Sequence, residues 1–314
     1  MHETVSVIIP NYNNGQWLSK AIQSCLDQGV YLKEIIVIDD QSDDDSLAVL
    51  NTWKQKTDKL KVFTSPEKGA NNARNFGLEQ ATGLFIQWLD ADDQLLPDKF
   101  ADQLSVFAAH PDIEIVYSDI VQNFYENDQF KRSETRRAGP DQDYLETLLL
   151  DHWIANNSYL LKRSAADLGA KLNGWNPETP VHQDTEYFIK LAIAGVTFRY
   201  LPGVYSTYSK WSAETVSQLN FQNKVQAKFF LFENFKATIE QSEKVNLHNK
   251  KVYLSIINTT LLQLSFYNRA LVIKKPFSLF SIRPRIIKTR FKYFVYFQYA
   301  VQTLRYWINR VFAL

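Results

Sequence analysis

Two hydrophobic periodicities alternate along the first third of the chain. Short runs of Val, Ile, Leu and Phe are typical of buried strands, namely "VSVIIP", "EIIVID", "KVFTS" and "LFIQWL". Three helices are predicted between these strands. Apolar residues recur at helical spacing in the first, at Trp17, Leu18, Ala21, Ile22, Cys25 and Leu26, and in the second, at Leu47, Leu50 and Trp53. The third is "GANNARNFGLEQATG". Continuous apolar strands separated by helices predict an α/β fold, with a mostly parallel central sheet and helices on both faces.

The pattern becomes less regular after Pro97. The elements predicted there are a helix with Phe100, Leu104 and Phe107, a strand "IEIVYSD", a short helix "YLETLLL", strands "SYLLKR" and "TFRYLP", and a helix "DTEYFIKLAIAG" that ends at Gly195. The polar residues 122–143 are either irregular or a hairpin, and from about Phe221 the chain is helical and aromatic. We therefore expect one domain over residues 1–220, with halves of about 1–100 and 101–220, and a helical region over 221–314.

Composition indicates the cellular compartment and shows that charge is unevenly distributed along the chain. The 314 residues are 45% hydrophobic, which is enough to bury a core. The single cysteine, Cys25, excludes an internal disulfide and is interpreted as a buried helix residue in preference to a catalytic thiol. With no leader pattern in "MHETVSVIIP", we expect a cytoplasmic protein. All 34 acidic residues lie in the first 243 positions, whereas residues 244–314 carry 13 of the 35 basic residues, so the two parts must have different partners.

Three acidic residues crowd into four positions of "WLDADDQ", directly after a buried strand. Like charges this close destabilise a fold unless positive charge lies among them. Parallel sheets bind ligands at the carboxyl ends of their strands, and two other strand ends here, "PNYN" and Asp39-Asp40, are also polar. Two carboxylates on a tight turn suit a Mg²⁺ or Mn²⁺ ion that holds a diphosphate. The alternative is a solvated turn with capping aspartates, but the facing acidic strand end favours the metal.

Four segments together resemble family 2 glycosyltransferases of the GT-A (Rossmann-like) fold. They are "VSVIIPNYNNGQWLSKAIQSCLDQ", "EIIVIDDQSDDDS", "GANNARNFGLEQATGLFIQWLDADD" and "HQDTEYFIKLAIAG". The resemblance covers about residues 4–217, with the motifs in the family's order and spacing. It implies an enzyme that moves a sugar from a nucleotide diphosphate sugar, with UDP favoured, to a hydroxyl of a saccharide acceptor with inversion of stereochemistry.

The resemblance also implies roles for individual positions. The nucleotide sugar would contact Pro10, Asn11, Tyr12, Asn13, Asp39, Asp40, Arg74, Asp90, Ala91 and Asp92. Asp40 would accept a hydrogen bond from a uracil N–H, and Arg74 would line the nucleotide pocket unless it is only an exposed helix arginine. Asp92 is the first choice as the ligand of the Mn²⁺ or Mg²⁺ ion, and Asp93 is a close second. This ion would then be the positive charge that the acidic turn requires.

An inverting transfer needs a base within hydrogen-bond reach of the acceptor hydroxyl. The family position for this base matches Asp184, although Asp184 could be only the cap of the helix that follows. Residues expected near the acceptor, from position alone, are Trp153, Asn156, Asn157, Trp175, His182 and Gln183. One departure is that many relatives have a His where this chain has Trp211, which cannot ligate a cation. His182 could substitute for that His, or be a partly exposed loop residue, and Lys210 could meet the phosphates directly.

The tail over residues 244–314 combines basic residues with dense Phe, Tyr and Trp and contains no acid. The longest uncharged run in its last segment, residues 293–304, is shorter than the roughly 20 residues that cross a bilayer. A basic and aromatic helical surface fits an anionic leaflet, so we expect peripheral attachment to the inner face of the cell membrane and a lipid-linked acceptor. Nucleic acid is disfavoured because the aromatic residues crowd together and do not alternate as stacking platforms. Packing on the domain, or in a dimer, is the remaining alternative.

Two other classes of protein compete with the enzyme. A nucleotide-sugar or glycan-binding protein of the same fold, without turnover, is supported by Trp211 in the His position. A nicotinamide-dependent oxidoreductase is disfavoured, because the first strand leads into "PNYNNG" and not into a G-x-G-x-x-G turn. The sequence specifies no oligomeric state.

Overall fold

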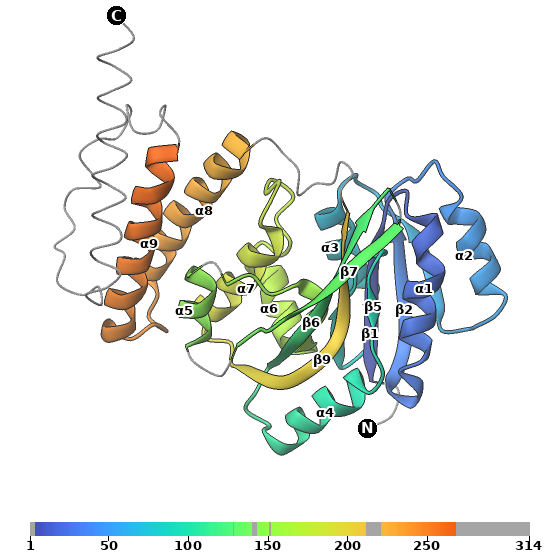
Figure 1. Cartoon of the computed structure of the whole chain (residues 1–314). Helices are drawn as coiled ribbons and strands as arrows, with labels where there is room; N and C mark the ends of the chain where they lie inside the picture. Colours follow the sequence, from blue (N-terminus) through green and yellow to red (C-terminus); the bar gives the residue numbers. More distant parts are fainter. Residues whose placement is uncertain (1–3, 128, 140–142, 151, 212–220, 268–314) are drawn as a thin grey trace, which may run out of the picture. The chain divides into compact units, whose positions relative to one another are not determined.

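The computed structural model describes residues 4–127, 129–139, 143–150, 152–211 and 221–267 (Figure 1). The chain divides into two compact units, residues 1–219 and 220–314. All the strands that the structure describes belong to the first unit, whereas the described part of the second unit is helical.

Four parallel strands form the N-terminal half of the sheet (Figure 1). Their order is β3-β2-β1-β4, with β1 at Val5–Asn11, β2 at Leu32–Asp39, β3 at Leu60–Thr64 and β4 at Phe85–Trp88. The connections contain α1 (Gly15–Leu26), a 3₁₀ turn (Gly29–Tyr31), α2 (Ser46–Lys54) and α3 (Ala70–Gln80). β1, β2 and β4 are almost entirely buried, because helices cover both faces of the sheet. This burial explains why their sequences are unbroken apolar runs.

The other strands continue the sheet in the order β4-β8-β6-β9-β5. β8 (Leu160–Lys162) is antiparallel to β4 and β6, β9 (Phe198–Trp211) runs parallel to β6 (Ile115–Glu126), β5 (Gln94–Leu95) pairs with β9, and β7 (Gln129–Arg136) pairs with β6. The helices are α4 (Lys99–Ala109), α5 (Tyr144–Leu149), α6 (Arg163–Lys171) and α7 (Gln183–Ile193), with a 3₁₀ turn at Asn156–Ser158. The predicted α/β fold is confirmed, with a sheet that is parallel in its first half and mixed in its second.

β7, β6 and β9 form a three-stranded ribbon that is longer than the strands predicted from the sequence. Of the two interpretations of residues 122–143, the hairpin is correct for β6 and β7. The strand predicted to end at Pro202 continues to Trp211, and a register irregularity beside Asp119 accommodates Pro202 and Gly203 within it. Much of the ribbon is partly exposed, so a continuous apolar signal does not mark its strands.

The predicted apolar helix faces are mostly buried. Cys25 is fully buried on α1, as expected of a structural cysteine. Burial also raises the pKa of its thiol, which keeps it protonated and unreactive. Leu50 of α2 is likewise buried, whereas Leu47 of the same helix is 46% exposed. Because α2 is short and lies at the edge of the sheet, only part of its surface meets the core.

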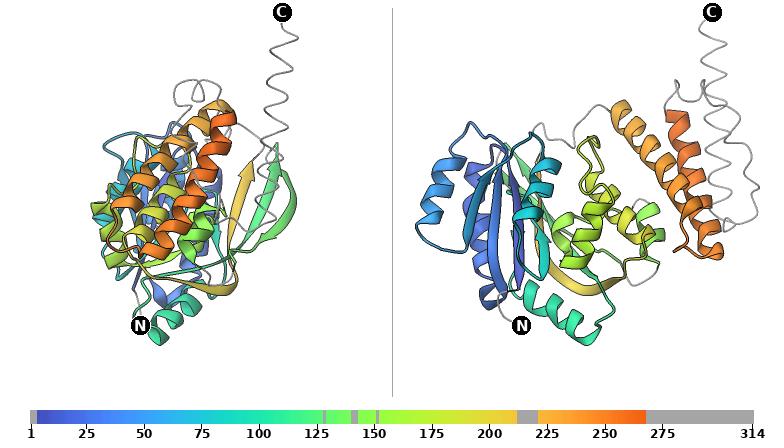
Figure 2. Two further views of the ribbon diagram at one scale, coloured as in Figure 1. Left: turned by 90° about the vertical axis from the view of Figure 1, so that its left-hand side faces the viewer. Right: turned by 180° about the vertical axis from the view of Figure 1, so that it is seen from behind.

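The two faces of β1 pack against different helices (Figure 2). Val5, Val7 and Ile9 join a core that includes apolar residues of α1 and α4. Ile8 points to the opposite face, where a Cβ on Gly77 of α3 would lie only 2.4 Å from Ile8 Cγ2. Gly77 therefore lets α3 lie directly on β1, which brings the polar residues of α3 level with the carboxyl ends of the strands.

Within the described residues, the second unit is a pair of long helices, α8 (Phe221–Gln241) and α9 (Leu247–Tyr267). The buried side chains between them are Phe229, Phe232, Phe235 and Ile239 of α8 and Tyr253, Ile257 and Leu261 of α9. The predicted helical character is confirmed for these residues, whereas residues 268–314, with most of the basic tail, lie outside the described part. Among the described helices, none has the length and apolar character that a bilayer crossing requires.

A buried carboxylate joins the strands at the opposite end of the sheet from the acidic turn. Glu34 of β2 is 3% exposed and accepts hydrogen bonds from Ser6 Oγ at 2.6 Å, from Lys61 Nζ at 2.6 Å, and from the backbone N–H and hydroxyl of Thr82. Burial opposes its charged form, but these donors outweigh burial and lower the pKa of Glu34 from 4.5 to about 2. The Glu34 carboxylate therefore connects β2 to β1, to β3 and to the turn before β4.

Replacing Glu34 by Gln should lower the free energy of unfolding by about 2 kcal/mol at pH 7, because a charged acceptor with several donors is lost. Since the folded-state pKa is depressed, this contribution is present above pH 4.5 and disappears as the pH falls towards 2. Urea unfolding at several pH values tests both statements. Glu79→Gln, at an exposed position of α3, is the control and should change stability by less than about 0.5 kcal/mol. An equal loss of stability at pH 3 and pH 7 would contradict the role of the charge.

Candidate active site

The carboxyl ends of β1 and β2 form a polar rim held together by hydrogen bonds. Asn11 Nδ2 donates to Asp39 Oδ1 at 3.0 Å, and the Ser42 hydroxyl donates to the same oxygen at 2.7 Å. The other oxygen of Asp39 accepts the backbone N–H of Ser42, and Asp39 is 1% exposed. Asp39 therefore shapes the loop after β2 by closing it onto β1.

Two acceptors on this rim have no partner among the described residues. They are Asp40 Oδ1 and Asn11 Oδ1, both buried. The second oxygen of Asp40 accepts the backbone N–H of Gly69 at 2.8 Å, which fixes the carboxylate in place. A buried acceptor without a donor costs free energy, and a ligand that supplies donors at this rim would remove that cost.

The residues beside these acceptors also point to a ligand. Tyr12 is 50% exposed, and Lys68 Nζ lies 5.8 Å from the centre of its ring. Asn13 has a positive φ of 53° and is held by Ser42 and Asp43, so the chain turns sharply after β1. Pro10 lies partly exposed just before this turn. An exposed ring on a rigid turn is a suitable surface on which a planar base can stack.

α3 delivers a buried positive charge to the acidic turn. Arg74 is only 6% exposed and donates to Asp90 Oδ1 at 2.7 Å and to Asn71 Oδ1 at 3.2 Å. Its guanidinium also lies 4.6 Å from the ring centre of Trp175. The alternative of an exposed helix arginine was therefore wrong, and Arg74 supplies part of the positive charge that the acidic turn requires.

The three aspartates of the acidic turn differ in their surroundings. Asp90 is partly exposed and accepts hydrogen bonds from Arg74 and from Asn156 Nδ2. Asp92 Oδ2 accepts the indole N–H of Trp211 at 2.6 Å. Asp93 is 1% exposed, and its two oxygens accept hydrogen bonds from the backbone N–H of Ser209 and from Asn157 Nδ2, each at 2.7 Å. Asp93 thus connects the turn to β9 and to the 3₁₀ turn before β8.

The turn carries more negative charge than its partners offset. Burial and the neighbouring Asp90 raise the pKa of Asp92 to about 6, although the bond from Trp211 acts in the opposite direction. Burial and the charges of Asp92 and Asp90 likewise raise the pKa of Asp93 well above its usual range. A cation near Asp92 would relieve this repulsion.

A divalent ion fits one aspartate of the turn better than the other. Asp92 has one oxygen, Oδ1, that accepts no hydrogen bond from another described residue, whereas each oxygen of the buried Asp93 already accepts one. Ala91, between Asp90 and Asp92, is buried and offers a ligand only its backbone atoms. Among the residues that the structure describes, no three His, Cys, Asp or Glu side chains gather closely enough to hold an ion by themselves.

Asp184 lies in the first turn of α7, in the second half of the domain. Its Oδ2 accepts the indole N–H of Trp153 at 2.5 Å, and its Oδ1 accepts the backbone N–H of Thr185 at 2.8 Å. The N-cap position belongs to His182, which has a positive φ of 62°, so Asp184 is not the cap of this helix. Burial raises the pKa of Asp184, while the bonds from Trp153 and Thr185 lower it in part.

Tyr208 of β9 is a site residue that the sequence analysis did not include. Its ring packs edge-on against Trp153, with 4.9 Å between ring centres. Its pKa is raised by burial and by the charges of Asp93, Asp90, Asp184 and Asp92, which places it among all four carboxylates. Because the strand was predicted to end at Pro202, the two-residue alternation that points Ser206, Tyr208 and Lys210 to one face was not considered.

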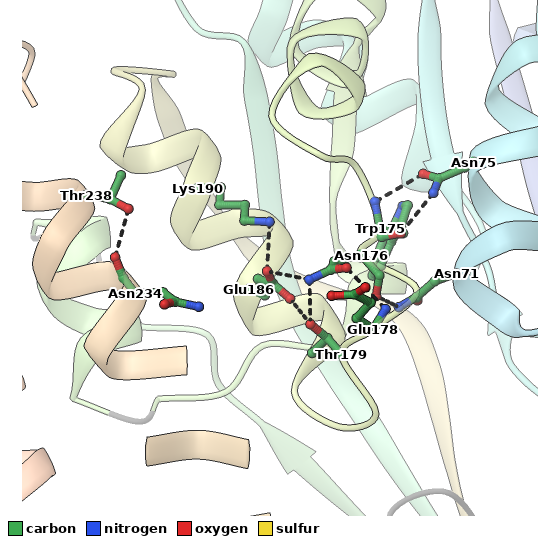
Figure 3. A network of polar contacts seen from close by, with 10 residues as sticks. All are labelled: Asn71, Asn75, Trp175, Asn176, Glu178, Thr179, Glu186, Lys190, Asn234 and Thr238. Carbon is green, nitrogen blue, oxygen red and sulfur yellow. Dashed lines mark hydrogen bonds and ion pairs between the residues drawn. The ribbon is translucent and has the colours of Figure 1, made fainter. Parts of the chain in front are cut away.

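A polar network joins α3 to the loop before α7 (Figure 3). Asn75 forms two hydrogen bonds with the backbone of Trp175, accepting its N–H at 3.0 Å and donating to its C=O at 2.8 Å. Asn71 donates to the C=O of Asn176 at 2.7 Å, and the Asn176 amide in turn reaches Glu186 of α7. The helix that carries Arg74 and the helix that carries Asp184 are therefore connected through one loop.

The residues predicted near the acceptor lie at two depths. Trp175 and Asn157 are at most 1% exposed and lie beneath the site, Trp175 stacked on Tyr187 and Asn157 bonded to Asp93. Asn156 is also buried, beside Asp90. Trp153, His182 and Gln183 are partly exposed around Asp184, and Gln183 Nε2 donates to the C=O of Thr179.

The chain belongs to a known family of enzymes. The sequence profile of Glycosyl transferase family 2 matches residues 6–167, just over half of the chain, and this segment contains the polar rim, Arg74 and the acidic turn. The chain is therefore a member of glycosyl transferase family 2, as the resemblance of its motifs implied.

Individual relatives match over shorter segments. An uncharacterized glycosyltransferase of Haemophilus influenzae is 34% identical over 165 residues, which make up 52% of this chain and 64% of that protein. The GalNAc(5)-diNAcBac-PP-undecaprenol beta-1,3-glucosyltransferase of Campylobacter jejuni is 42% identical over 94 residues, or 29% of this chain and 30% of that enzyme. The aligned part thus spans less than two thirds of either relative.

Solved structures with low sequence identity share the fold. TarS of S. aureus in complex with UDP-GlcNAc superposes with a TM-score of 0.63 at 18% identity, over 86% of this chain and 75% of that chain. The mannosyltransferase PcManGT of Pyrobaculum calidifontis, in complex with GDP-Man and Mn²⁺, has a TM-score of 0.54 at 18% identity, over 88% of this chain and 82% of that chain. These similarities confirm the GT-A fold.

Replacing Asn75 by Ala should lower the free energy of unfolding by about 1–2 kcal/mol, because the N–H and C=O of Trp175 both lose their partner. Chemical denaturation at pH 7 measures the change. Asn72→Ala is the matched control, since its side chain makes only one exposed hydrogen bond, to the C=O of Lys68 just before the helix, and it should cost less than about 0.5 kcal/mol. Equal effects of the two substitutions would show that the clamp on Trp175 contributes nothing.

Proposed function

We propose that this protein is an inverting glycosyltransferase that moves a sugar from a nucleotide diphosphate sugar, with UDP favoured, to a hydroxyl of a saccharide acceptor. One observation carries the proposal. Two buried acceptors without a partner lie at the carboxyl ends of β1 and β2, next to β4, which leads into an acidic turn that is short of positive charge. Asp184 lies close enough to Asp90 of this turn for the charge of Asp90 to raise the pKa of Asp184. This arrangement suits a base and ribose at one end, a diphosphate in the middle and a reacting hydroxyl at the other end.

The nucleotide would bind at the carboxyl ends of β1 and β2. Asp40 Oδ1 would accept the N–H of a uracil, and Asn11 Oδ1 would accept a second donor of the base or ribose. Tyr12 offers its exposed ring as a stacking surface, and Asp39 holds the loop in place. The presence of UDP-GlcNAc in the similarly folded TarS structure agrees with this assignment.

The diphosphate would lie against the acidic turn. Asp92 would hold a Mn²⁺ or Mg²⁺ ion through its free oxygen, with Asp90 beside it, and such an ion when bound neutralises charge on the leaving diphosphate. Asp93 is assigned a structural role, because both of its oxygens bind Ser209 and Asn157. Arg74 would orient Asp90 and contribute positive charge close to the phosphates.

Asp184 would act as the general base. As the acceptor hydroxyl attacks the anomeric carbon, its proton passes to Asp184, the new glycosidic bond forms, and the bond from that carbon to the diphosphate oxygen breaks. Trp153 and Thr185 hold the carboxylate in one orientation, while burial raises its pKa and so increases its basicity. The acceptor would approach along the partly exposed side chains of Trp153, His182, Gln183 and Tyr208.

The acceptor is proposed to be lipid-linked and the protein to be peripheral on the inner face of the cell membrane. The Campylobacter jejuni relative is named for an undecaprenyl-diphosphate saccharide, which is an acceptor of this kind. The basic and aromatic tail over residues 244–314 fits an anionic leaflet, where each Lys or Arg near the surface contributes about 1 kcal/mol. Cell-surface polysaccharide or lipopolysaccharide synthesis is the process that uses such acceptors.

A second candidate is a protein of the same fold that binds the nucleotide sugar without transferring it. The observation that favours it is the bond from Trp211 to Asp92, which occupies one oxygen of the proposed metal ligand. Incubating the protein with a panel of nucleotide sugars, with and without Mn²⁺, separates the two candidates. Release of the nucleoside diphosphate from one donor, dependent on Mn²⁺, supports the enzyme. Tight donor binding without hydrolysis or transfer supports the binding protein.

Replacing Asp184 by Asn should lower kcat at least about 1000-fold, because the hydroxyl proton has no acceptor, while the Kd of the donor changes less than about threefold. Isothermal titration and a transfer assay measure the two quantities. In the unsubstituted protein, kcat/KM should fall at acid pH, and the raised pKa places this fall above the ordinary range of an aspartate. Full turnover in the Asn variant would exclude Asp184 as the base.

The tail should bind anionic vesicles through its charge. A full-length variant with every Lys and Arg of residues 268–314 changed to Gln should lose flotation with phosphatidylglycerol vesicles, whereas the unsubstituted protein should float and be released at high salt. Neutral phosphatidylcholine vesicles serve as the control and should bind neither protein. Flotation of the substituted chain with anionic vesicles would contradict the electrostatic attachment.

A further inference from the structure

Trp211 contacts Asp92, the residue that is proposed to bind the cation. It ends β9, and its indole N–H donates to Asp92 Oδ2 at 2.6 Å. The preceding strand reinforces this contact, because the Ser209 hydroxyl donates to the backbone C=O of Asp92 at 2.7 Å. Both the side chain and the main chain of Asp92 are therefore fixed by β9.

The indole itself is held by two other aromatic rings. The ring of Tyr125, directly across the strand pair on β6, stacks on Trp211 with 4.2 Å between ring centres and 22° between planes. The ring of Trp17 on α1 lies 4.6 Å from Trp211 on a tilted plane. Residues from α1, β6 and β9 thus restrict the indole, so the N–H cannot turn away from Asp92 without disturbing this packing.

This geometry restricts how Asp92 can meet a cation. Oδ2 is occupied by the indole N–H, whereas Oδ1 accepts no hydrogen bond from another described residue. A contact through Oδ1 would leave the bond to Trp211 in place. In metal sites, a hydrogen-bond partner that orients a ligand typically contributes about 10- to 100-fold to metal affinity or activity.

We propose that Trp211 is a positioning residue for Asp92, which fixes the orientation of the carboxylate that would bind the divalent ion of the nucleotide diphosphate. This inference rests on the proposed function, because it takes Asp92 as the ligand. Trp211 does not touch the ion or the substrate, and it acts only by orienting Asp92. A neutral indole donor leaves the carboxylate charge in place, which a cation requires.

The test measures Mn²⁺ binding to the full-length protein in the presence of UDP. The electron paramagnetic resonance signal of free Mn²⁺ reports how much of the ion is unbound. Trp211→Phe keeps an aromatic ring between Trp17 and Tyr125 and removes only the N–H donor. It should weaken Mn²⁺ binding about 10- to 100-fold. The Mn²⁺ concentration for half-maximal transfer should rise by the same factor, with kcat at saturating Mn²⁺ within about threefold of the unsubstituted value. A purely structural role of Trp211 would not be rescued by added metal.

Two variants complete the experiment. Trp211→His restores a nitrogen donor at the position and should recover at least part of the Mn²⁺ affinity that the Phe variant loses. Trp53→Phe is the matched control, because it also deletes one indole N–H donor, here bonded to Ser19 Oγ at 3.0 Å, and it should leave Mn²⁺ binding unchanged. Circular dichroism verifies that each variant is folded.

Unchanged or tighter Mn²⁺ binding in Trp211→Phe would overturn the inference, since the indole would then be irrelevant to the ion or compete with it. If the Phe variant does not fold, Trp211→Leu, which also lacks a hydrogen-bond donor, is judged by the same criterion. Failure of the proposed function gives a different result. In that case the unsubstituted protein transfers no sugar from any donor, while the comparison of Mn²⁺ binding between the variants remains valid.

Discussion

The concentration of negative charge at the acidic turn is the constraint on which the rest of the site depends. Each carboxylate is compensated by a different part of the fold: Asp90 by Arg74 of α3, Asp92 by Trp211 of β9, and Asp93 by Asn157 and by the backbone of β9. Because the repulsion among these groups is relieved only when all the partners are in place, the turn draws a helix, a strand and a 3₁₀ turn to one point. The charge that suits the chemistry therefore also organises the architecture around it.

This compensation is incomplete, and the incompleteness is informative. The pKa of Asp92 stays raised, and Asp40 and Asn11 each keep a buried oxygen without a donor. Both features cost free energy in the protein alone, and both would be removed by the cation and the hydrogen-bonding ligand of the proposed function. Residual costs of this kind are expected where a fold serves binding before stability.

The two halves of the site are linked by rigid contacts. Arg74 belongs to the half that is proposed to bind the nucleotide and Asp184 to the acceptor half, yet the clamp of Asn75 on the loop at Trp175 connects their helices (Figure 3). Asp184 is in turn oriented by Trp153, whose ring packs on Tyr208. A transfer reaction gains from such rigidity, because the attacking hydroxyl and the leaving group must be aligned within a fraction of an ångström.

Local sequence determined the elements and the motifs of this protein. The apolar runs of β1, β2 and β4 and the helical spacing of α1 and α7 are properties of neighbouring residues, so their periodicity predicted them, and the motifs between them predicted the family. The burial of Arg74, the structural partners of Asp93, the long ribbon of β6, β7 and β9, and the bond from Trp211 to Asp92 were decided only by the tertiary structure. These contacts join residues far apart in the chain, 119 positions in the case of Trp211 and Asp92, and no local period carries information about such a distance.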